Sequence, residues 1–440
     1  GNRYRGQDMD FFKRIFKNWV EKDRPNSENT IKEIITVCAK DWKQPLETID
    51  QICENFLIFK EIAFSILKFL HRKELKNEKY ETITYKYVFY CLQEVNWIIH
   101  QFLITGIKLE NYRRESPDNF FGKNKITEKE RRYGSVSLDN SEYLNPYVSR
   151  NYYLPYTIKM SSDNMFSSAM IFPSDFLLQK MKTANIGGYF KDTIYSRWNG
   201  QFQNDESYKT YFDKLNSEER LLLKEFQEAK KQNIENNLCG IILTHKIKGL
   251  KILLVNGHHP KKHEGKILEK ICRFFTMYKL IDEWKSKEKI DTIFLAGDFN
   301  TDFREEQGKI IYEFLSKRKI PEKFKEKLKN LNLPSEIYEE PDEKNKYINY
   351  NEQLYKSMDY FTQQSEQNSK PENQKILDMI FAAKSSNIIN QNFVKKTCPY
   401  FTKRLPNKKT SKLISDHGIV QIAFDLVIPE IDINLDKFFS

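Results

Sequence analysis

Apolar residues recur along the chain with two different spacings, and the two spacings alternate. A helical spacing predicts helices within residues 10–75, 216–232 and 266–284. Asn216, with Glu219 three residues later, is a typical signal for a helix start. Short apolar runs that stop at polar or glycine residues predict strands, at 85–95, 167–172, 239–247, 250–259, 291–300, 375–383 and 417–427.

Helices that alternate with strands predict an α/β fold with mixed sheets, in which 239–247 and 250–259 form a hairpin. The chain has 440 residues, and we expect a single domain over residues 1–440. Two stretches interrupt the pattern: 105–155 is charged and loop-like, and 335–375 is rich in Glu, Asn, Gln and Lys. Both are predicted to be polar insertions.

The stretch DTIFLAGDFN, residues 291–300, ends a predicted buried strand with polar side chains. Its apolar run stops at Gly297, and Asp298 and Asn300 follow with one residue between them. In α/β proteins, ligands bind at the loops beyond the carboxyl ends of strands. A Gly-Asp pair at a strand end is also a common turn, so this stretch alone leaves both interpretations open.

Polar residues also end other predicted strands, where a buried strand would not need them. Each has an ordinary structural explanation: Glu94 could cap a helix, either histidine could be a satisfied core residue, and Asp416 could form a turn. Asp378 lies inside the apolar run ILDMIF, where a carboxylate needs a partner. The strand-end residues are Glu94, Asn256, His258, Asp298, Asn300, Asp416 and His417.

Together these side chains supply what the hydrolysis of a phosphodiester needs. Carboxylates bind Mg²⁺ or Mn²⁺, an aspartate orients water, and amide and imidazole groups donate to phosphate oxygens. The sequence contains no glycine-rich phosphate loop and no Gly-x-Ser-x-Gly motif that would favour a different reaction. The combination therefore favours metal-dependent cleavage of a phosphate ester.

The charge of the chain bears on its partner. Lysine and arginine exceed aspartate and glutamate by 72 to 61, a formal net charge of +11. This excess suggests an anionic partner, with nucleic acid first, although a solvated lysine-rich surface explains the same number. The six cysteines are far apart and form no C-x-x-C pair, which fits reduced thiols better than a disulfide framework or a zinc site.

The most apolar stretch, FLIFKEIAFSILKFL at 56–70, is interrupted by Lys60, Glu61 and Lys68. This pattern predicts an amphipathic helix with one buried face, and we expect no membrane insertion.

Four short motifs, LQEV, N-x-H, GDFN and SDH in this order, resemble those of the endonuclease/exonuclease/phosphatase superfamily of metal-dependent phosphoesterases. YINY (347–350), LDMIF (377–381), and LPN followed by SDH resemble elements of its deadenylase-like branch. The resemblance covers most of the chain after the N-terminal helices. It implies a four-layer sandwich of two mixed β-sheets flanked by helices, with the site at one end of the sheets.

The resemblance also implies which residues bind the metal and the attacking water. Glu94 would hold Mg²⁺ or Mn²⁺, Asp416 would assist on the metal side, and Asp298 would orient or deprotonate the water. The superfamily's first strand ends in an asparagine that helps to hold the metal, and Asn2 is the only candidate for it. Because the strand before Asn2 is missing, we expect either a longer natural chain or a sheet without that edge.

The remaining matches would handle the phosphate. Asn300 would bind the scissile phosphate, and Asn256 and His258 would line it. His417 would stabilise charge on the phosphoryl group, with Asp378 holding its tautomer. SMDYF (357–361) is a rival for the position of LDMIF, but the apolar neighbours of Asp378 make LDMIF the better strand.

The resemblance implies hydrolysis of single-stranded RNA, from the 3′ end, by a deadenylase-like exoribonuclease. Residues 335–375 interrupt the stretch where poly(A)-cutting relatives place an aromatic residue against a base, so other substrates stay open: abasic DNA, an inositol phosphate or a sphingolipid headgroup. A different alternative is a catalytically degenerate family member that serves as a structural subunit of a large assembly.

The absent initiator methionine, the basic charge and the reduced cysteines favour a mitochondrial matrix protein whose targeting segment has been removed. A cytoplasmic protein with a trimmed start explains the same features.

Overall fold

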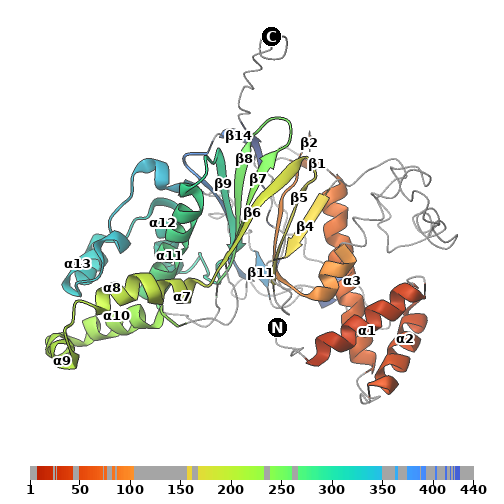
Figure 1. Ribbon diagram of the computed structural model, residues 1–440, viewed down its shortest axis with the longest axis horizontal. Coiled ribbons are helices and arrows are strands. Elements are labelled where there is room, and N and C mark those ends of the chain that lie inside the picture. Colours follow the sequence, from red (N-terminus) through yellow and green to blue (C-terminus); the bar gives the residue numbers. More distant parts are fainter. Residues whose placement is uncertain are drawn as a thin grey trace, which may run out of the picture. The chain divides into compact units, whose positions relative to one another are not determined.

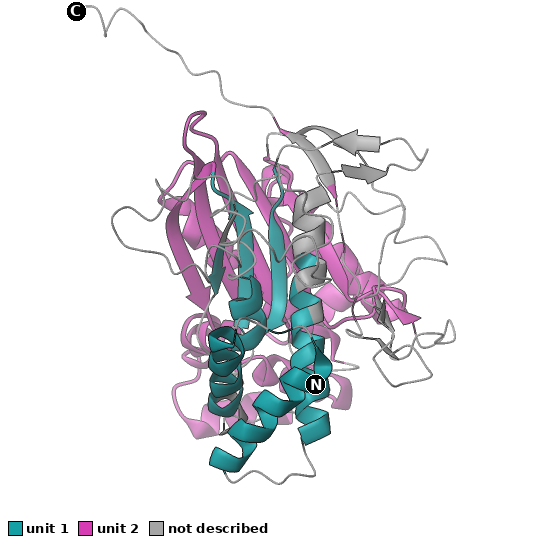
Figure 2. Cartoon of the chain, turned by 90° about the vertical axis from the view of Figure 1, so that its right-hand side faces the viewer, with its two compact units in different colours: residues 1–76, 81–174, 400–416 teal, residues 77–80, 175–399, 417–440 magenta. Residues whose placement is uncertain are grey.

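A computed structural model describes a large part of the chain. The described residues are 7–22, 25, 27–42, 49–72, 74–76, 82–84, 87–103, 156–160, 167–231, 238–259, 266–348, 362–364, 374–386, 388–392, 402–403, 412–413, 417, 420 and 422–426. They fall into two compact units, each built from separate stretches of chain (Figure 2). Unit 1 comprises residues 1–76, 81–174 and 400–416, and unit 2 comprises 77–80, 175–399 and 417–440. The interpretation as one domain stays a prediction.

Unit 1 begins with three helices, as the periodicity of residues 10–75 predicts. They are α1 (Gln7–Glu21), α2 (Glu28–Asp41) and α3 (Ile49–Arg72). Their shared core is rich in aromatic rings in edge-to-face contact: the centroid of Phe102 lies 5.2 Å from those of both Phe16 and Trp19. Such pairs stabilise a core beyond the apolar area that they bury.

The strands of unit 1 are all antiparallel to their described neighbours. The main sheet has three strands with β5 in the centre, in the order β3 (Tyr90–Val95), β5 (Ser167–Pro173), β4 (Tyr156–Met160). Two short pairs join β1 (Glu74–Lys76) to β2 (Thr82–Thr84) and β15 (Thr402–Lys403) to β16 (Lys412–Leu413).

Unit 2 is built on a mixed sheet of six strands. Its order is β10 (Tyr347–Ile348), β13 (Asp378–Ala383), β9 (Thr292–Asp298), β8 (Lys251–His258), β7 (Leu238–His245), β6 (Phe176–Ala184). β8 and β9 are parallel, and the other neighbours are antiparallel, including the predicted hairpin of β7 and β8. Two further pairs join β11 (Gln363–Gln364) to β12 (Gln374–Lys375) and β14 (Ile388–Asn392) to β17 (Ala423–Leu426). The α/β class and the presence of two sheets with helices are therefore confirmed.

Helices of unit 2 lie against one face of this sheet, as α11 and α12 do beside β9 in Figure 1. Asn216 and Glu219 form the predicted capping box at the start of α10, each side chain bonding the other's backbone amide at 2.9 Å. The helical segments are α7 (Ile186–Tyr189), the π-helix η2 (Phe190–Tyr195), α8 (Ser196–Asn199), α9 (Asp205–Asp213), α10 (Ser217–Glu228), α11 (Ile267–Ser286), α12 (Glu306–Lys317), α13 (Glu322–Asn330) and the 3₁₀ turns η3 (Ser335–Ile337) and η4 (Glu343–Asn345).

Strand alternation divides the side chains of the six-stranded sheet into two sets. One set joins the core that the helices share, and includes Leu253, Val255, Ile293, Leu295, Met379 and Phe381. The register then assigns the alternate positions to the opposite face, and these include Asn256, His258, Asp298 and Asp378. The polar strand-end residues therefore share one face, and the apolar residues between them anchor the sheet to the helices.

A glycine in β9 allows this strand to approach β8 closely beside the strand ends. Gly257 and Gly297 are partners in the parallel register. A Cβ atom added to Gly297 would lie 2.0 Å from the carbonyl oxygen of Gly257, closer than any non-bonded contact allows. Gly297 is therefore required because a side chain would collide with the neighbouring backbone. Its backbone conformation does not require glycine, since its φ is not in the left-handed region.

The first part of the predicted insertion 335–375 belongs to the folded unit. Residues 335–348 form η3, η4 and the edge strand β10, whose Tyr347 is buried with its ring centroid 4.8 Å from that of Tyr278. The polar composition concealed this because the buried residues Ile337, Tyr338 and Tyr347 are separated by a run of charged and polar residues. The insertion 105–155 lies outside the described residues.

The segment 56–70 lies within α3, as predicted, and α3 carries the charged residues that break its apolar run. Within the described part of the chain, every helix is too short or too polar to span a bilayer.

Replacement of Gly297 by alanine tests the close approach of β8 and β9. The added methyl group would push the strands apart, and overpacking of this kind costs about 1–3 kcal/mol and sometimes more. We expect Gly297→Ala to lower the free energy of unfolding in urea by about 3 kcal/mol. Gly249→Asn is the control, because Gly249 is left-handed, no described atom lies within 4 Å of its added Cβ, and asparagine tolerates that conformation. Equal stability of both variants would contradict the packing argument.

Candidate active site

Three neighbouring strands bring three of the predicted residues into one row. Asp298 ends β9, and the register sets it beside His258 of the parallel strand β8 and Asp378 of the antiparallel strand β13. The row explains the polar strand ends, because each side chain occupies the last or first position of a strand whose interior is apolar. GDFN is therefore part of a polar cluster as well as a turn.

The turn itself is made by Asp298. Its Oδ1 accepts a hydrogen bond from the backbone amide of Asn300 at 2.8 Å, the two-residue pattern typical of aspartate in turns. Asn300 is left-handed, with φ at 46°, a conformation that asparagine adopts more readily than most residues. Its side-chain amide donates to the carbonyl oxygen of His259, which ties the turn to the end of β8. Asp298 Oδ1 is thus engaged by the backbone, and Oδ2 remains for the cluster.

His417 and Asp378 form the pair that the sequence predicts. The Nδ1 atom of His417 lies 2.8 Å from Oδ2 of Asp378. Since an ionised carboxylate only accepts hydrogen bonds, Nδ1 carries the proton and Nε2 is the atom presented to the rest of the cluster. A contact across 39 residues of sequence thereby sets both the tautomer and the ring orientation.

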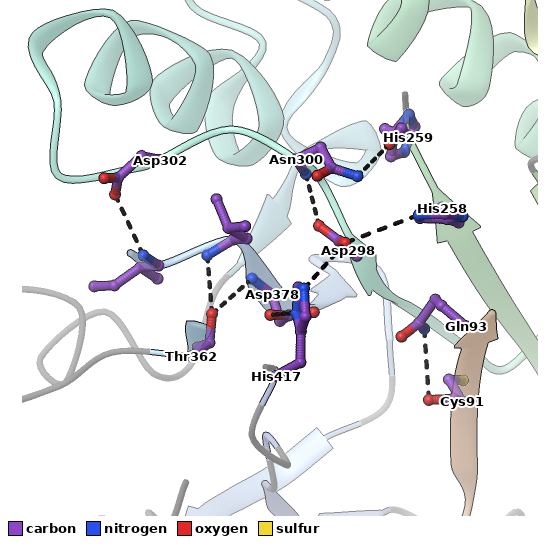
Figure 3. A network of polar contacts seen from close by, with 12 residues as sticks. Cys91, Gln93, His258, His259, Asp298, Asn300, Asp302, Thr362, Asp378 and His417 are labelled. Atoms are coloured by element: carbon purple, nitrogen blue, oxygen red, sulfur yellow. Dashed lines mark hydrogen bonds and ion pairs between the residues drawn. The ribbon is translucent and has the colours of Figure 1, made fainter. Parts of the chain in front are cut away.

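Two imidazole nitrogens converge on one carboxylate oxygen. The distance to Asp298 Oδ2 is 3.8 Å from His417 Nε2 and 3.9 Å from His258 Nε2 (Figure 3). These separations exceed a direct hydrogen bond, and an oxygen atom between the groups could bond to more than one of them. The side chain of Asp298 is 9% exposed, whereas those of His258 and His417 are 25% and 29% exposed, so the cluster is open to solvent on its histidine side.

The two carboxylates of the row stand on directly paired residues, an arrangement that repulsion between like charges disfavours. The structure gives each one its own donor: the Asn300 amide for Asp298, and His417 for Asp378. These donors reduce the repulsion, and the excess negative charge still favours a protonated imidazole or a cation nearby.

Asn256 lies two residues before His258 on the same face of β8, and it is completely buried. The structure thus places Asn256 on the same face of the sheet as the cluster, farther from the strand end than His258. Its side-chain amide is shielded from solvent. Its predicted contact with the phosphate stays untested.

The predicted metal ligands are described only in part. Glu94 is exposed and belongs to unit 1, where it sits in a β-bulge between Leu92 and Val95 with φ at 52°. It does not cap the helix that follows, because Asn96 Oδ1 accepts the Ile99 amide at 2.9 Å and supplies the cap. Its role in metal binding stays a prediction.

Asn2 and Asp416 lie outside the described residues, and so does the rival segment 357–361.

Three side chains of the cluster in unit 2 could hold a metal ion. Asp298, Asp378 and His417 can each bring one ligand atom within 4.8 Å of the others. One donor there is a nitrogen, and Asp378 Oδ2 is already bonded to His417. Mg²⁺ prefers an all-oxygen set, so this mixed set of oxygen and nitrogen donors matches it less well. The carboxylate of Glu94 is a donor of the preferred type, and its place as a ligand stays a prediction.

His259 was missed by the sequence analysis, which treated only its neighbour His258 as a site residue. Its ring stacks on Phe299 with centroids 5.4 Å apart and meets the edge of Phe274 at 4.7 Å. Neither ring nitrogen has a hydrogen-bond partner among the described residues. Burial lowers the pKa of His259 to about 3, with the nearby positive charges of His258 and Arg273 acting in the same direction. His259 is therefore a neutral packing residue beneath the loop that carries Asn300.

Thr362 was also missed, because it lies in the polar stretch assigned to an insertion. Its side-chain oxygen accepts the backbone amides of Leu377 and Asp378, at 2.9 and 3.1 Å. Nothing in the local pattern marks it, since a threonine among Gln, Ser and Asn residues is ordinary in a loop.

No protein-family model matches the chain, and no curated protein matches it either. Solved structures do. The mannosyl-6-phosphatase of Bacteroides thetaiotaomicron is 11% identical, with 62% of this chain and 78% of that chain covered and a TM-score of 0.35. The human nocturnin catalytic domain is 13% identical over 62% and 73% of the two chains, with a TM-score of 0.33. An endonuclease/exonuclease/phosphatase family protein from Bacteroides thetaiotaomicron is 12% identical over 60% and 73%, also with a TM-score of 0.33.

The last of these structures carries the name of the superfamily that the sequence motifs resemble. At these identities and TM-scores the three structures carry no argument about the fold or the activity of this chain.

The buried neutral state of His259 predicts an acid-sensitive step in stability. Its folded pKa, about 3, lies below the unfolded value of about 6.5, so the unfolded chain binds the extra proton between these two values. Stability is therefore full above about pH 6.5 and falls as the pH drops toward 3. We expect His259→Leu to remove up to one proton from the pH slope of the unfolding free energy. Titration of the His259 ring near pH 6.5 in carbon-detected NMR would contradict the assignment.

Proposed function

We propose that this chain is a metal-dependent phosphodiesterase that hydrolyses single-stranded RNA, in the manner of a 3′ exoribonuclease. The observation that carries the proposal is the convergence of His258 Nε2 and His417 Nε2 on Asp298 Oδ2, with Asp378 bonded to the far side of His417. A histidine that only packs in the core, or an aspartate that only forms a turn, would not need two imidazoles and a second carboxylate around it.

The residues divide the work of an in-line displacement at phosphorus. Asp298 Oδ2 accepts a hydrogen bond from a water molecule and orients its lone pair toward the phosphorus, while Oδ1 stays fixed by the Asn300 amide. As the water oxygen bonds to phosphorus, the P–O3′ bond breaks, the water proton passes to Asp298, and the leaving 3′ oxygen takes up a proton from solvent. A strong base is not needed, because the reaction depends mainly on positioning and on neutralisation of charge.

The imidazoles act on the phosphoryl group. Asp378 accepts a hydrogen bond from Nδ1–H of His417, which favours the imidazolium form and makes Nε2–H a donor to a phosphate oxygen. His258 supplies a second imidazole from the opposite side of Asp298. Asn300 gives one amide proton to the His259 carbonyl and keeps the other for the phosphate.

A divalent cation held by Glu94, with Asp416 and Asn2 as the other predicted ligands, would supply further neutralisation of phosphate charge. Mg²⁺ is the expected ion, and Mn²⁺ accepts the same ligands.

The choice of RNA rests on two features of the sequence. The motifs resemble the deadenylase-like branch, and the net charge of +11 favours a polyanion over a small phosphate ester. A mitochondrial location and membership of a large assembly stay predictions from the sequence alone.

The first test is turnover by the purified chain. With Mg²⁺ and a 5′-labelled oligo(A), we expect shortening from the 3′ end that stops on chelation. Asp298→Asn keeps the shape of the side chain but removes the negative charge that makes it a strong hydrogen-bond acceptor for water. The rate should therefore fall by about 10²- to 10⁴-fold while RNA binding persists. The measurements are gel analysis of products and fluorescence anisotropy of bound RNA.

Asp282→Asn is the matched control, because Asp282 lies on α11, is 49% exposed at its side chain and pairs with Lys285. It should retain the wild-type rate. A panel of abasic DNA, an inositol phosphate and a sphingolipid headgroup ester identifies the substrate if RNA is not cut. Equal turnover by wild type and Asp298→Asn would show that the assignment of the site is wrong.

Metal use tests Glu94 separately. Glu94→Gln removes one anionic ligand, and loss even of an outer partner commonly weakens metal binding by about 10- to 100-fold. We therefore expect the Mg²⁺ concentration for half-maximal activity to rise by about tenfold or more, with partial recovery at high Mg²⁺. Asp298→Asn should show no such recovery. An unchanged Mg²⁺ requirement would exclude Glu94 as a ligand.

A further inference from the structure

The start of strand β13 is held by side-chain oxygens as well as by strand pairing. Asp302 Oδ1 accepts the backbone amide of Ile376 at 3.3 Å. Thr362 Oγ1 accepts the next two amides, those of Leu377 and Asp378, at 2.9 and 3.1 Å (Figure 3). Three consecutive amides are thus bonded to two side chains, immediately before the carboxylate that orients His417.

The carbonyl groups of the same segment bond to the loop after β9. Leu377 O accepts the amide of Phe299 at 2.9 Å, and Ile376 O accepts that of Phe303 at 3.1 Å. Phe299 lies between Asp298 and Asn300. The segment that carries Asp378 is therefore bonded directly to the loop that carries the water-orienting aspartate.

Thr362 is the member of this set best suited to hold a fixed position. It is completely buried, and its own amide donates to the Lys375 carbonyl at 2.9 Å, so the residue is bonded through both backbone and side chain. A hydroxyl oxygen has two lone pairs, and here both serve adjacent amides. Removal of the hydroxyl would leave the two amides at the start of β13 without this acceptor.

We propose that Thr362 is a positioning residue of the active site, which fixes Asp378 and through it the direction of His417 Nε2 toward Asp298. Thr362 acts on the backbone of Asp378 and touches no substrate. The part played in catalysis rests on the proposed phosphodiesterase function, whereas the effect on the Asp378–His417 pair does not.

Two substitutions at position 362 separate the hydroxyl from the space it fills. Thr362→Val keeps the volume and removes the acceptor, whereas Thr362→Ser keeps the acceptor. Because misplacement of a catalytic group by about 1 Å can cost about 10²-fold in rate, we expect Thr362→Val to lower kcat on oligo(A) by about 10- to 100-fold with KM nearly unchanged. Thr362→Ser should retain wild-type kcat within about threefold.

Thr292→Val is a matched control for the loss of a buried threonine hydroxyl. Thr292 is completely buried in β9, and its Oγ1 has no hydrogen-bond partner within the described part of the chain. This variant should keep both kcat and KM. A similar fall in kcat for both valine variants would mean that the effect is a general loss of packing, and the proposal would be overturned.

NMR gives a readout that does not depend on turnover. In Thr362→Val, the amides of Leu377 and Asp378 should exchange faster with solvent, and the Nδ1–H resonance of His417 should shift or broaden. Thr362→Ser should preserve both signals. If wild type cuts no phosphodiester but the signals respond in this way, the proposed function fails and the positioning role stands. If wild type is active and Thr362→Val changes neither kcat nor these signals, the positioning role fails and the proposed function stands.

Discussion

The close parallel pairing of β8 and β9 is the constraint on which the candidate site depends. Gly297 lies so close to the backbone of Gly257, its partner in the register, that no side chain fits at position 297. Because side chains alternate along a strand, a slip of one residue would send Asp298 to the helix-covered face. The same register places His258 on one side of Asp298, and the antiparallel pairing with β13 places Asp378 on the other.

The two faces of the six-stranded sheet differ in the side chains that they carry. On one face, residues such as Leu295 and Phe381 pack into a core with α11 and α12 and supply most of the apolar burial of unit 2. On the other face, the polar side chains gather at one end of three strands. The separation lets the polar cluster tolerate two neighbouring carboxylates, since the stability of the unit comes from apolar contacts elsewhere.

The sequence was sufficient for the elements and for much of the cluster, because both depend on local patterns. The hairpin of β7 and β8, the capping box of α10 and the strand ends of GDFN and LDMIF follow from periodicity and turn chemistry. The contact between His417 and Asp378 followed from motif resemblance, since periodicity alone gives no distance between residues far apart in sequence. Thr362 could not be predicted, because a side chain that accepts backbone amides of another segment leaves no spacing to detect. His259 was hidden by its polarity: it packs as a neutral ring among aromatic residues.

The order in which the chain is synthesised determines when the cluster can be completed. β8, β9 and β13 precede His417, and the partner of Asp378 emerges from the ribosome only after all three strands of the row have been made. A nascent chain can thus form the sheet and its helix-covered core while the acid–base pair is still incomplete. The sheet could therefore form with the Asp378 carboxylate still lacking its His417 imidazole, which joins it only when the last part of the chain arrives.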